Sequence, residues 1–296
     1  MGLRVLEPGL YSLLVGRGRS GSRHLGVPAG GPADYSACAL GNALVGNPPD
    51  ALALEVTLLG PTLRADALIA GVVFGAPFQL SGSLQVGRSF NLTVGEVLKI
   101  GGTPNGCRAY LCVSGGFIGR EILGSDSALE PICRDDLLKC GSSSLKPRTG
   151  VASEFTGPTL LRVLPGPQKN WFGDTHFFEH SYTVATAGNR MGLRLLGTPL
   201  LRSPRELASE PVAPGAVQIT NDGLPVVLGV DGQTIGGYPK IAHVIRADLD
   251  ALGQLRPGDS VRFVEITEED AEAAYREKRA TLRRTIAFWR ANLEFG

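Results

Sequence analysis

The strongest fold signal in this chain is the stretch LPVVLGVDGQTIGGYPK, residues 224–240. Its first part, Leu224–Val230, is rich in Val and Leu and predicts a buried strand. Its second part, Asp231–Lys240, is a loop of glycines and polar residues that ends in one lysine. Glycines let the backbone approach a ligand, and a lysine can meet an anion or a carbonyl oxygen, or act as a base if its pKa is lowered. A strand that delivers such a loop is typical of a functional site.

Short apolar runs between turns recur along the whole chain. The 40 glycines and 20 prolines are spread over its length, which favours many short strands over a linker of low complexity. We therefore predict a mainly β fold with a few helices. The predicted strands are Tyr11–Val15, Ala51–Leu58, Leu68–Phe74, Ser89–Val94, Arg108–Val113, Thr159–Val163, Ser181–Thr186, Val217–Thr220, Pro225–Val230 and Ser260–Glu265.

Two segments predict helices. The first is Pro32–Val45, with proline in the first turn and Gly46-Asn47 as a stop signal. The second runs from Glu268 to about Leu293, where apolar residues recur at helical spacing and indicate one packed face. Thr267 precedes it as a cap and Asp270 follows three residues later, a variant of the capping box.

A polar stretch between Gly141 and Gly157 suggests a boundary. It fits either an interdomain linker or one long loop within a single body. On the first interpretation, the chain has an N-terminal domain over residues 1–150 and a C-terminal domain over residues 151–296. A chain of 296 residues is long enough for two domains of ordinary size.

Composition narrows the function classes. The 29 basic and 28 acidic residues leave a net charge of +1, which gives no electrostatic case for nucleic acid. No apolar run reaches the roughly 18 residues of a membrane span, and the first residues do not resemble a secretory signal. The five cysteines form no CxxC pair. We expect a cytoplasmic protein with free thiols, of which Cys38 and Cys112 are buried.

Two short motifs have an ordinary structural interpretation beside a functional one. Residues 16–21 match GxGxxG, but the following segment, Ser22–Pro28, does not suit the helix that a dinucleotide site requires. Its arginines, Arg17, Arg19 and Arg23, belong either to a functional loop or to a solvated turn. Residues 176–180 match HxxEH, yet they run into a strand-like segment and lack a third ligand. We predict no metal site here, and expect packing by the two phenylalanines.

Further glycine clusters hold candidate binding residues. In Gly26–Asp34, Gly30 and Gly31 precede a helix N-terminus, an arrangement that suits an anion. The alternative is that Asp34 simply favours the positive end of the helix dipole. In Asn189–Arg194, the planar guanidinium of Arg190 is suited to a carboxylate or phosphate.

Six motifs, in order along the chain, carry a family resemblance. The chain is similar to the allophanate hydrolase subunit 2 family, which includes the C subunit of bacterial 5-oxoprolinase, the KipI antagonist KipA, and one half of the carboxyltransferase region of urea carboxylase. The motifs are GVPAGGPAD, NALVGNPPDALALEVTLLGP, RVLPGPQKNWF, GNRMGLRL, ELASEPVAPGAVQIT and DGQTIGGYPKIAHVIRADL.

The resemblance implies a fold of two cyclophilin-like β-barrel subdomains and a partner of the allophanate hydrolase subunit 1 (KipI) type. It implies first a role in a 5-oxoprolinase complex, with an A subunit and with ATP that binds to this chain or to another subunit. One alternative is half of a carboxyltransferase that accepts carboxybiotin from a carrier protein. The other is a non-catalytic, KipA-like regulator that binds a KipI-like kinase inhibitor.

The resemblance also implies roles for motif residues. The catalytic candidates are Lys240, which would bind a ureido oxygen or assist proton transfer, and Tyr238. The substrate-binding candidates are Asn189, Arg190, Gln218, Gln233, Gly236 and Gly237, and the anion-binding candidates are Gly30 and Gly31. Two departures from the family pattern, at Val15-Gly16 and in the shortened segment Ser127–Asp136, imply that a binding function of the N-terminal half is lost or altered.

Overall fold

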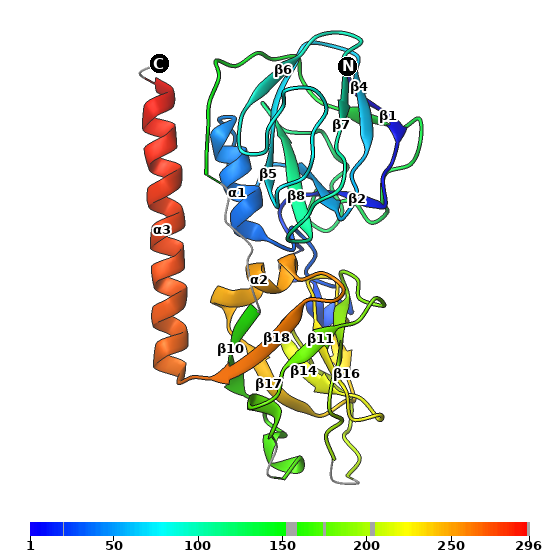
Figure 1. Ribbon diagram of the computed structural model, residues 1–296, viewed down its shortest axis with the longest axis vertical. Coiled ribbons are helices and arrows are strands. Elements are labelled where there is room, and N and C mark those ends of the chain that lie inside the picture. Colours follow the sequence, from blue (N-terminus) through cyan, green and yellow to red (C-terminus); the bar gives the residue numbers. More distant parts are fainter. Residues whose placement is uncertain (20, 152–158, 174–175, 202–204, 295–296) are drawn as a thin grey trace. The chain divides into compact units, whose positions relative to one another are not determined.

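The computed structural model describes residues 1–19, 21–151, 159–173, 176–201 and 205–294 (Figure 1). It divides the chain into two units. The N-terminal unit comprises Met1–Gly18, Gly30–Phe155 and Ala280–Gly296, and the C-terminal unit comprises Arg19–Ala29 and Thr156–Arg279. Both units are built mainly from strands, so the predicted fold class is confirmed.

The N-terminal unit contains two antiparallel sheets. The four-stranded sheet has the order β7-β4-β1-β9, with β1 at Gly2–Glu7, β4 at Thr62–Ala65, β7 at Val97–Lys99 and β9 at Leu137–Lys139. The five-stranded sheet has the order β2-β3-β8-β5-β6, with β2 at Tyr11–Val15, β3 at Ala53–Thr57, β5 at Ile69–Gly75, β6 at Phe90–Leu92 and β8 at Arg108–Val113. In the described residues these sheets stay open, where the family resemblance led us to expect a closed barrel. The edge strands are β7 and β9 in one sheet and β2 and β6 in the other, and in the described residues none of these four pairs with another edge strand.

Apolar residues of both sheets form the core of the N-terminal unit. Leu3 and Leu63 from one sheet and Val56 and Leu111 from the other are fully buried in one cluster. Helix α1, Tyr35–Leu44, packs against β5 and β8, where Cys38 and Cys112 are buried, as predicted. It therefore covers the outer face of the five-stranded sheet (Figure 1).

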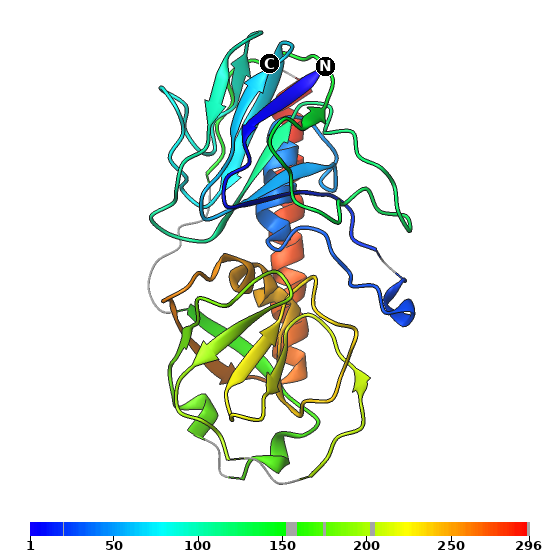
Figure 2. The ribbon, with the colours of Figure 1, turned by 90° about the vertical axis from the view of Figure 1, so that its right-hand side faces the viewer.

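The C-terminal unit contains a closed barrel (Figure 2, green to orange). Its order is β10-β17-β14-β15-β12-β11-β18, and only the β10–β18 pair is parallel. The strands are β10 at Thr159–Pro165, β11 at Tyr182–Val184, β12 at Gly192–Leu196, β14 at Ala216–Ile219, β15 at Pro225–Leu228, β17 at Lys240–Val244 and β18 at Ser260–Glu265. A separate two-stranded sheet pairs β13, Glu210–Pro211, with β16, Ile235–Gly236.

The barrel interior is apolar and contains an aromatic cluster. The rings of Phe177 and Phe263 stack with centroids 4.8 Å apart, and Tyr182 lies against both. Phe177 belongs to the short 3-10 helix η3, His176–Phe178, so this part of the HxxEH motif is a packing element. Among the described residues, no group of three or more His, Cys, Asp and Glu side chains is arranged to hold a metal.

Of the other helical elements, α3 is long and the rest are short. They are the 3-10 helices η1, η2 and η4 at Arg23–Leu25, Lys169–Trp171 and Arg246–Asp248, the helix α2 at Leu249–Gln254, and the helix α3 at Glu268–Glu294. The predicted cap of α3 is confirmed, since the backbone N–H of Asp270 donates to Thr267 Oγ1 at 3.1 Å. In the part of the chain that the structure describes, no helix is both long and apolar enough to cross a bilayer.

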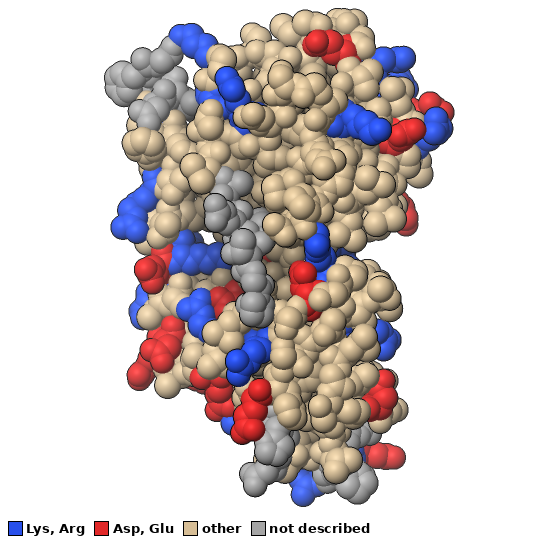
Figure 3. Space-filling model, viewed as in Figure 1, with Lys and Arg blue, Asp and Glu red and all other residues tan. Residues whose placement is uncertain are grey.

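Charged side chains of both signs are interspersed on the molecular surface (Figure 3). Neither sign gathers into one broad patch on the face that is shown, in agreement with the net charge of +1. On this face, the described residues form no broad electropositive surface of the kind that binds nucleic acid.

Candidate functional site

A row of side chains crosses the outer wall of the C-terminal barrel. Alternation along β14 buries Val217 and Ile219 in the barrel core and turns Gln218 outward. The strand register places Gln218 opposite Val226 on β15, and places Val226 opposite Arg194 on β12. On the other side of β14, Gln218 is opposite Lys240 on β17. Arg194, Val226, Gln218 and Lys240 therefore form one row over four adjacent strands, which we call the barrel-wall row.

A bulge in β17 brings Lys240 into this row. Val217 is opposite Ala242, but the next residue, Gln218, is opposite Lys240, so Ile241 is an extra residue on β17. A regular antiparallel register would pair Gln218 with Ile241 instead. Bulges re-aim a side chain and are common next to active sites.

A cavity of about 580 Å³ lies over the wall of strands β12, β14 and β15. This volume is in the range of small-molecule sites. Four candidates from the sequence line it, namely Asn189, Gln218, Gln233 and Tyr238. The other lining residues are Ala187, Met191, Gly192, Arg194, Thr220, Asn221, Asp222, Val226 and Leu228. Gln218 is only 2% exposed whereas Tyr238 is 38% exposed, so Gln218 lies at the base of the cavity and Tyr238 at its rim.

Lys240 is buried, is not among the residues that line the cavity, and is engaged in an ion pair. Its Nζ donates to Oε1 of Glu210 on β13, and Gln168 Nε2 donates to the same oxygen at 2.9 Å. The backbone N–H of Lys240 donates to Gln168 Oε1 at 3.0 Å. The hydrogen bond from Lys240 lowers the pKa of the Glu210 carboxyl, so this group is ionised at neutral pH. These contacts thus hold the Lys240 side chain, whose backbone is opposite Gln218 in the sheet.

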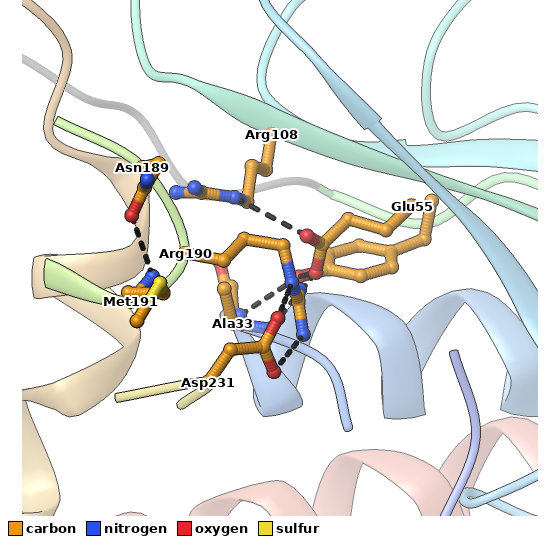
Figure 4. A network of polar contacts seen from close by, with 9 residues as sticks. Ala33, Glu55, Arg108, Asn189, Arg190, Met191 and Asp231 are labelled. Atoms are coloured by element: carbon orange, nitrogen blue, oxygen red, sulfur yellow. Dashed lines mark hydrogen bonds and ion pairs between the residues drawn. The ribbon is translucent and has the colours of Figure 1, made fainter. Parts of the chain in front are cut away.

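Arg190 is buried outside the cavity lining and pairs with Asp231 (Figure 4). Its Nε and Nη2 donate to the two carboxylate oxygens of Asp231 at 2.6 and 3.0 Å. The backbone N–H of Asp231 also donates to the Arg190 carbonyl at 3.1 Å, and Asn189 Oδ1 accepts from Met191 N–H at 2.8 Å. Arg190 therefore joins the two loops that carry Asn189 and Gln233, whereas the sequence suggested direct contact with a substrate.

The two predicted loop glycines have different surroundings. A Cβ atom on Gly236 would lie 2.6 Å from Gln233 Nε2 and 2.7 Å from Gln218 Nε2. A Cβ atom on Gly237 would meet only Ser209 Oγ at 3.5 Å and the Leu207 carbonyl at 3.6 Å. Neither glycine lines the cavity, but Gly236 lies behind the two glutamine amides and Gly237 faces another way.

Gly30 and Gly31 belong to the N-terminal unit and precede α1. Both have positive φ angles, 64° and 81°, which glycine adopts without strain. The N-terminus of α1 is capped by its own chain, because Asp34 Oδ1 accepts the Ala37 N–H at 3.0 Å. This geometry corresponds to the alternative in which Asp34 serves the helix dipole.

Arg194 and Asp222 are cavity residues that the sequence did not single out. Arg194 is exposed, and its guanidinium makes no hydrogen bond or ion pair within the described part of the chain, although its backbone carbonyl accepts from Ala185 N–H at 2.9 Å. Hydrogen bonds from Thr220 Oγ1 and the Leu224 N–H, with a smaller contribution from the charge of Arg194, lower the pKa of Asp222. The signal for Arg194 was the alternation of Gly192–Leu196, which turns Arg194 away from the barrel core.

The chain matches one family model over most of its length. The family is described as "Carboxyltransferase domain, subdomain A and B", and the match covers residues 25–265.

Relatives and solved structures agree with this match. The chain is 33% identical to the C subunit of 5-oxoprolinase from Escherichia coli (strain K12), over 93% of this chain and 95% of the relative. It is 31% identical to urea amidolyase of Lachancea kluyveri, over 89% of this chain but 17% of the relative. The crystal structure of K. lactis urea amidolyase superposes with a TM-score of 0.88 at 26% identity, and the match covers 96% of this chain and 20% of that one.

Proposed function

Because the chain belongs to the carboxyltransferase domain family of subdomains A and B, we propose that it is the C subunit of a 5-oxoprolinase-type complex, which opens 5-oxo-L-proline to glutamate with consumption of ATP. The observation that carries this proposal is the extent of the match. The similarity to the E. coli protein extends over nearly all of both chains, whereas the similarity to urea amidolyase covers 17% of that larger protein.

The chemistry of the cavity suits this substrate. 5-Oxo-L-proline carries a carboxylate, an apolar ring edge, and a lactam with one carbonyl acceptor and one N–H donor. Arg194 provides a planar cation for the carboxylate, and Gln218 provides an amide for the lactam. Val226, between them in the register, is an apolar floor for the ring. With strands about 4.8 Å apart, the backbones of Arg194 and Gln218 are roughly 10 Å apart, a span that two long side chains can close around a small ring.

Lys240 and Tyr238 are assigned to the ring-opening step. In this step the oxygen of water joins the lactam carbonyl carbon, the C–N bond breaks, and the ring nitrogen gains a proton as it becomes the amine of glutamate. Lys240, which pairs with Glu210 and is opposite Gln218 in the register, is the proposed proton source for that nitrogen. Tyr238, at the rim of the cavity, is the proposed partner of the attacking water.

ATP is proposed to bind to another subunit. The GxGxxG stretch of this chain leads into η1, a 3-10 helix of three residues, rather than into the α-helix that binds phosphate in dinucleotide sites. The proposed partners are therefore an allophanate hydrolase subunit 1 (KipI-type) protein and an A subunit that supplies the ATP site.

A second candidate is half of a biotin-dependent carboxyltransferase. The family name and the TM-score of 0.88 to K. lactis urea amidolyase favour it. The ureido carbonyl of biotin is a cyclic amide acceptor like that of the lactam, so the amide of Gln218 and the ammonium of Lys240 fit either ring. In that reaction, carboxybiotin from a carrier protein would supply the carboxyl group.

The decisive experiment is the reconstitution of the complex. The chain is co-expressed with its subunit 1 partner and A subunit, and ATP hydrolysis is measured with and without 5-oxo-L-proline. We expect hydrolysis that depends on 5-oxo-L-proline, and we expect Lys240→Met to abolish it without loss of complex formation. Lys99→Met, on the exposed side of β7, is the control and should retain activity.

The other outcomes separate the alternatives. Absence of 5-oxoproline-dependent hydrolysis, together with carboxyl transfer from carboxybiotin, would replace the first proposal with the second. A stable complex that supports neither reaction would favour a KipA-like regulator.

A further inference from the structure

We infer that the side-chain amides of Gln218 and Gln233 form a two-donor site for the carbonyl oxygen of a cyclic amide or ureide. This inference rests on the function proposed above for the identity of the ring, which is then the lactam of 5-oxo-L-proline. It adds that the carbonyl oxygen of the ring is the atom recognised, and that the amides of Gln218 and Gln233 recognise it. The donors, the glycine behind them and the cavity all belong to the C-terminal unit.

The first observation is a donor without an acceptor. Gln218 is 98% buried at the base of the cavity, yet its Nε2 has no hydrogen-bond partner in the described part of the chain. Buried side-chain donors are nearly always paired, because an unpaired one loses its bonds to water and gains none in return. An unpaired donor in a cavity wall is therefore explained by an acceptor that arrives with the ligand.

The second observation is convergence. The amide nitrogens of Gln218 and Gln233 both lie within 2.7 Å of the point where a Cβ on Gly236 would stand. Both nitrogens therefore lie against Gly236 and within roughly 5 Å of each other, a separation that one oxygen with two lone pairs can bridge as the acceptor of both donors. Because both donors are neutral, they favour a carbonyl oxygen over a carboxylate, for which Arg194 is the better partner.

The third observation concerns what can move. Gln233 is exposed, so its side chain can turn away from Gln218 and admit an oxygen between them. The backbone that carries Gln233 is held on both sides: Gly232 N–H donates to the Gly229 carbonyl at 3.0 Å, and Val212 N–H donates to the Thr234 carbonyl at 2.9 Å. The geometry is that of a fixed donor at the base and an adjustable donor above it.

Such a pair also has a role in the reaction. Addition of water to a lactam places negative charge on the carbonyl oxygen, and preorganised N–H donors stabilise that charge. The bulge also places Lys240, together with its counter-ion Glu210, opposite Gln218. We therefore expect the amide pair to affect both the affinity for the ring and the rate of opening.

Gly236→Ala is the sharpest test, because its methyl group would fill the space between the two amides. The backbone of Gly236 is outside the left-handed region, and the clashing atoms are the ends of side chains, so the variant should fold. Gly237→Ala is the matched control, since the same methyl group there meets only ordinary contacts outside the cavity. Gln218→Met removes the buried donor and preserves the length of the side chain.

The probe is pyrrolidin-2-one, which has the lactam but lacks the carboxylate, so its binding does not depend on the proposed reaction. Binding to the chain with its subunit 1 partner is followed by ligand-observed NMR. Proline, which has the carboxylate and no lactam, serves as the reference ligand. We expect Gly236→Ala and Gln218→Met to weaken pyrrolidin-2-one binding about ten-fold or more, and Gly237→Ala to stay within about two-fold of wild type.

Each result has a separate meaning for the two proposals. Lack of pyrrolidin-2-one binding to the wild type, or equal binding by Gly236→Ala and Gln218→Met, would overturn the amide site. Lactam binding that depends on Gln218, in a complex without 5-oxoproline-dependent ATP hydrolysis, would leave the amide site standing and remove the proposed reaction. If 5-oxoproline-dependent ATP hydrolysis persisted unchanged in Gly236→Ala and Gln218→Met, the proposed reaction would stand and the amide site would be removed.

Discussion

Two clusters of polar side chains, one in each unit, differ in how completely their hydrogen bonds are made. In the N-terminal unit, Glu55 Oε2 accepts from Ala33 N–H and from the Tyr110 hydroxyl, each at 2.9 Å, and Glu55 Oε1 lies 3.3 Å from Arg108 Nε (Figure 4). The Tyr110 oxygen in turn accepts from Asp34 N–H at 2.7 Å. In the described residues Arg108 Nε makes no hydrogen bond, but its ion pair with Glu55 gives it a charged partner within this Glu55 network. The barrel-wall row of the C-terminal unit instead leaves a buried donor on Gln218 and an exposed cation on Arg194.

The contrast distinguishes polar groups that stabilise the fold from polar groups that are available to a ligand. Burial, and then the charge of Glu55, raises the pKa of Tyr110 well above its usual value, so Tyr110 stays protonated and its hydroxyl donates a hydrogen bond to the carboxylate. The Glu55 network uses these bonds to fix the loop before α1, where Asp34 caps the helix. A buried group with a partner in the fold, by hydrogen bond or ion pair, stabilises the fold, whereas a donor in a cavity with no partner costs stability until a ligand pairs with it. The predictions below test this distinction.

The largest effect on stability is expected for Glu55→Gln. This change removes the carboxylate charge beside the guanidinium of Arg108, whose side chain is 6% exposed. Breaking a buried ion pair costs about 3–5 kcal/mol of unfolding free energy. Urea denaturation measures the loss, with the exposed Glu121→Gln as control. A loss below about 1 kcal/mol would show that the network does not carry the fold of this unit.

A smaller loss is expected for Asp231→Asn, which weakens the pair that joins the two cavity loops. Arg190 is 5% exposed but Asp231 is 30% exposed, so solvent relieves part of the cost, and about 1–3 kcal/mol should be lost. Because Asp231 is two residues before Gln233, the KM for 5-oxo-L-proline should rise more than kcat falls. The same denaturation series and steady-state kinetics measure both effects. An unchanged KM alongside lost stability would make the pair purely structural.

The strands with the strongest local signal were predictable. Tyr11–Val15 and Arg108–Val113 are β2 and β8 with the same bounds, and α1 and α3 lie where their caps and apolar spacing place them. The missed strands include β1, at the chain start, and the short β7 and β9. Short edge strands have little pattern of their own, because they are defined by distant partners such as the β1–β9 pair.

The site was predictable as a set of loops but not as a set of contacts. Asn189, Gln218, Gln233 and Tyr238 came from polar, glycine-rich segments, and the structure gathers them around one cavity. Lys240 pairs with Glu210, 30 residues away, and Arg190 pairs with Asp231, 41 residues away. No local sequence pattern predicts either pair. The bulge at Ile241 was equally invisible, since a run such as Lys240–Val244 has no mark of an unpaired residue.

Gln218→Met should behave in the opposite way to Glu55→Gln. The Nε2 of Gln218 makes no hydrogen bond in the described part of the chain, so its removal takes little from the folded state. We expect the unfolding free energy to stay within about 1 kcal/mol of wild type or to rise, since an apolar group of similar shape replaces an unpaired donor. Urea denaturation of the free chain measures this. A loss as large as that of Glu55→Gln would place Gln218 among the structural groups and contradict the comparison.

The smallest effect on the free energy of unfolding is expected from the Lys240–Glu210 pair. The pH dependence of this contribution distinguishes it from the others. Lys240 lowers the pKa of Glu210, so the pair contributes stability above the ordinary carboxyl pKa of 4.5, and the contribution is lost as pH falls through the lower folded value. The side chain of Glu210 is 35% exposed, and solvent screening limits this contribution to less than about 1 kcal/mol. Urea denaturation of wild type and Glu210→Gln should therefore differ slightly at pH 6 and converge toward pH 3. A difference that stayed constant over this range would mean that Glu210 acts by shape rather than by charge, and Lys240 would then lack the counter-ion that holds it beside Gln218.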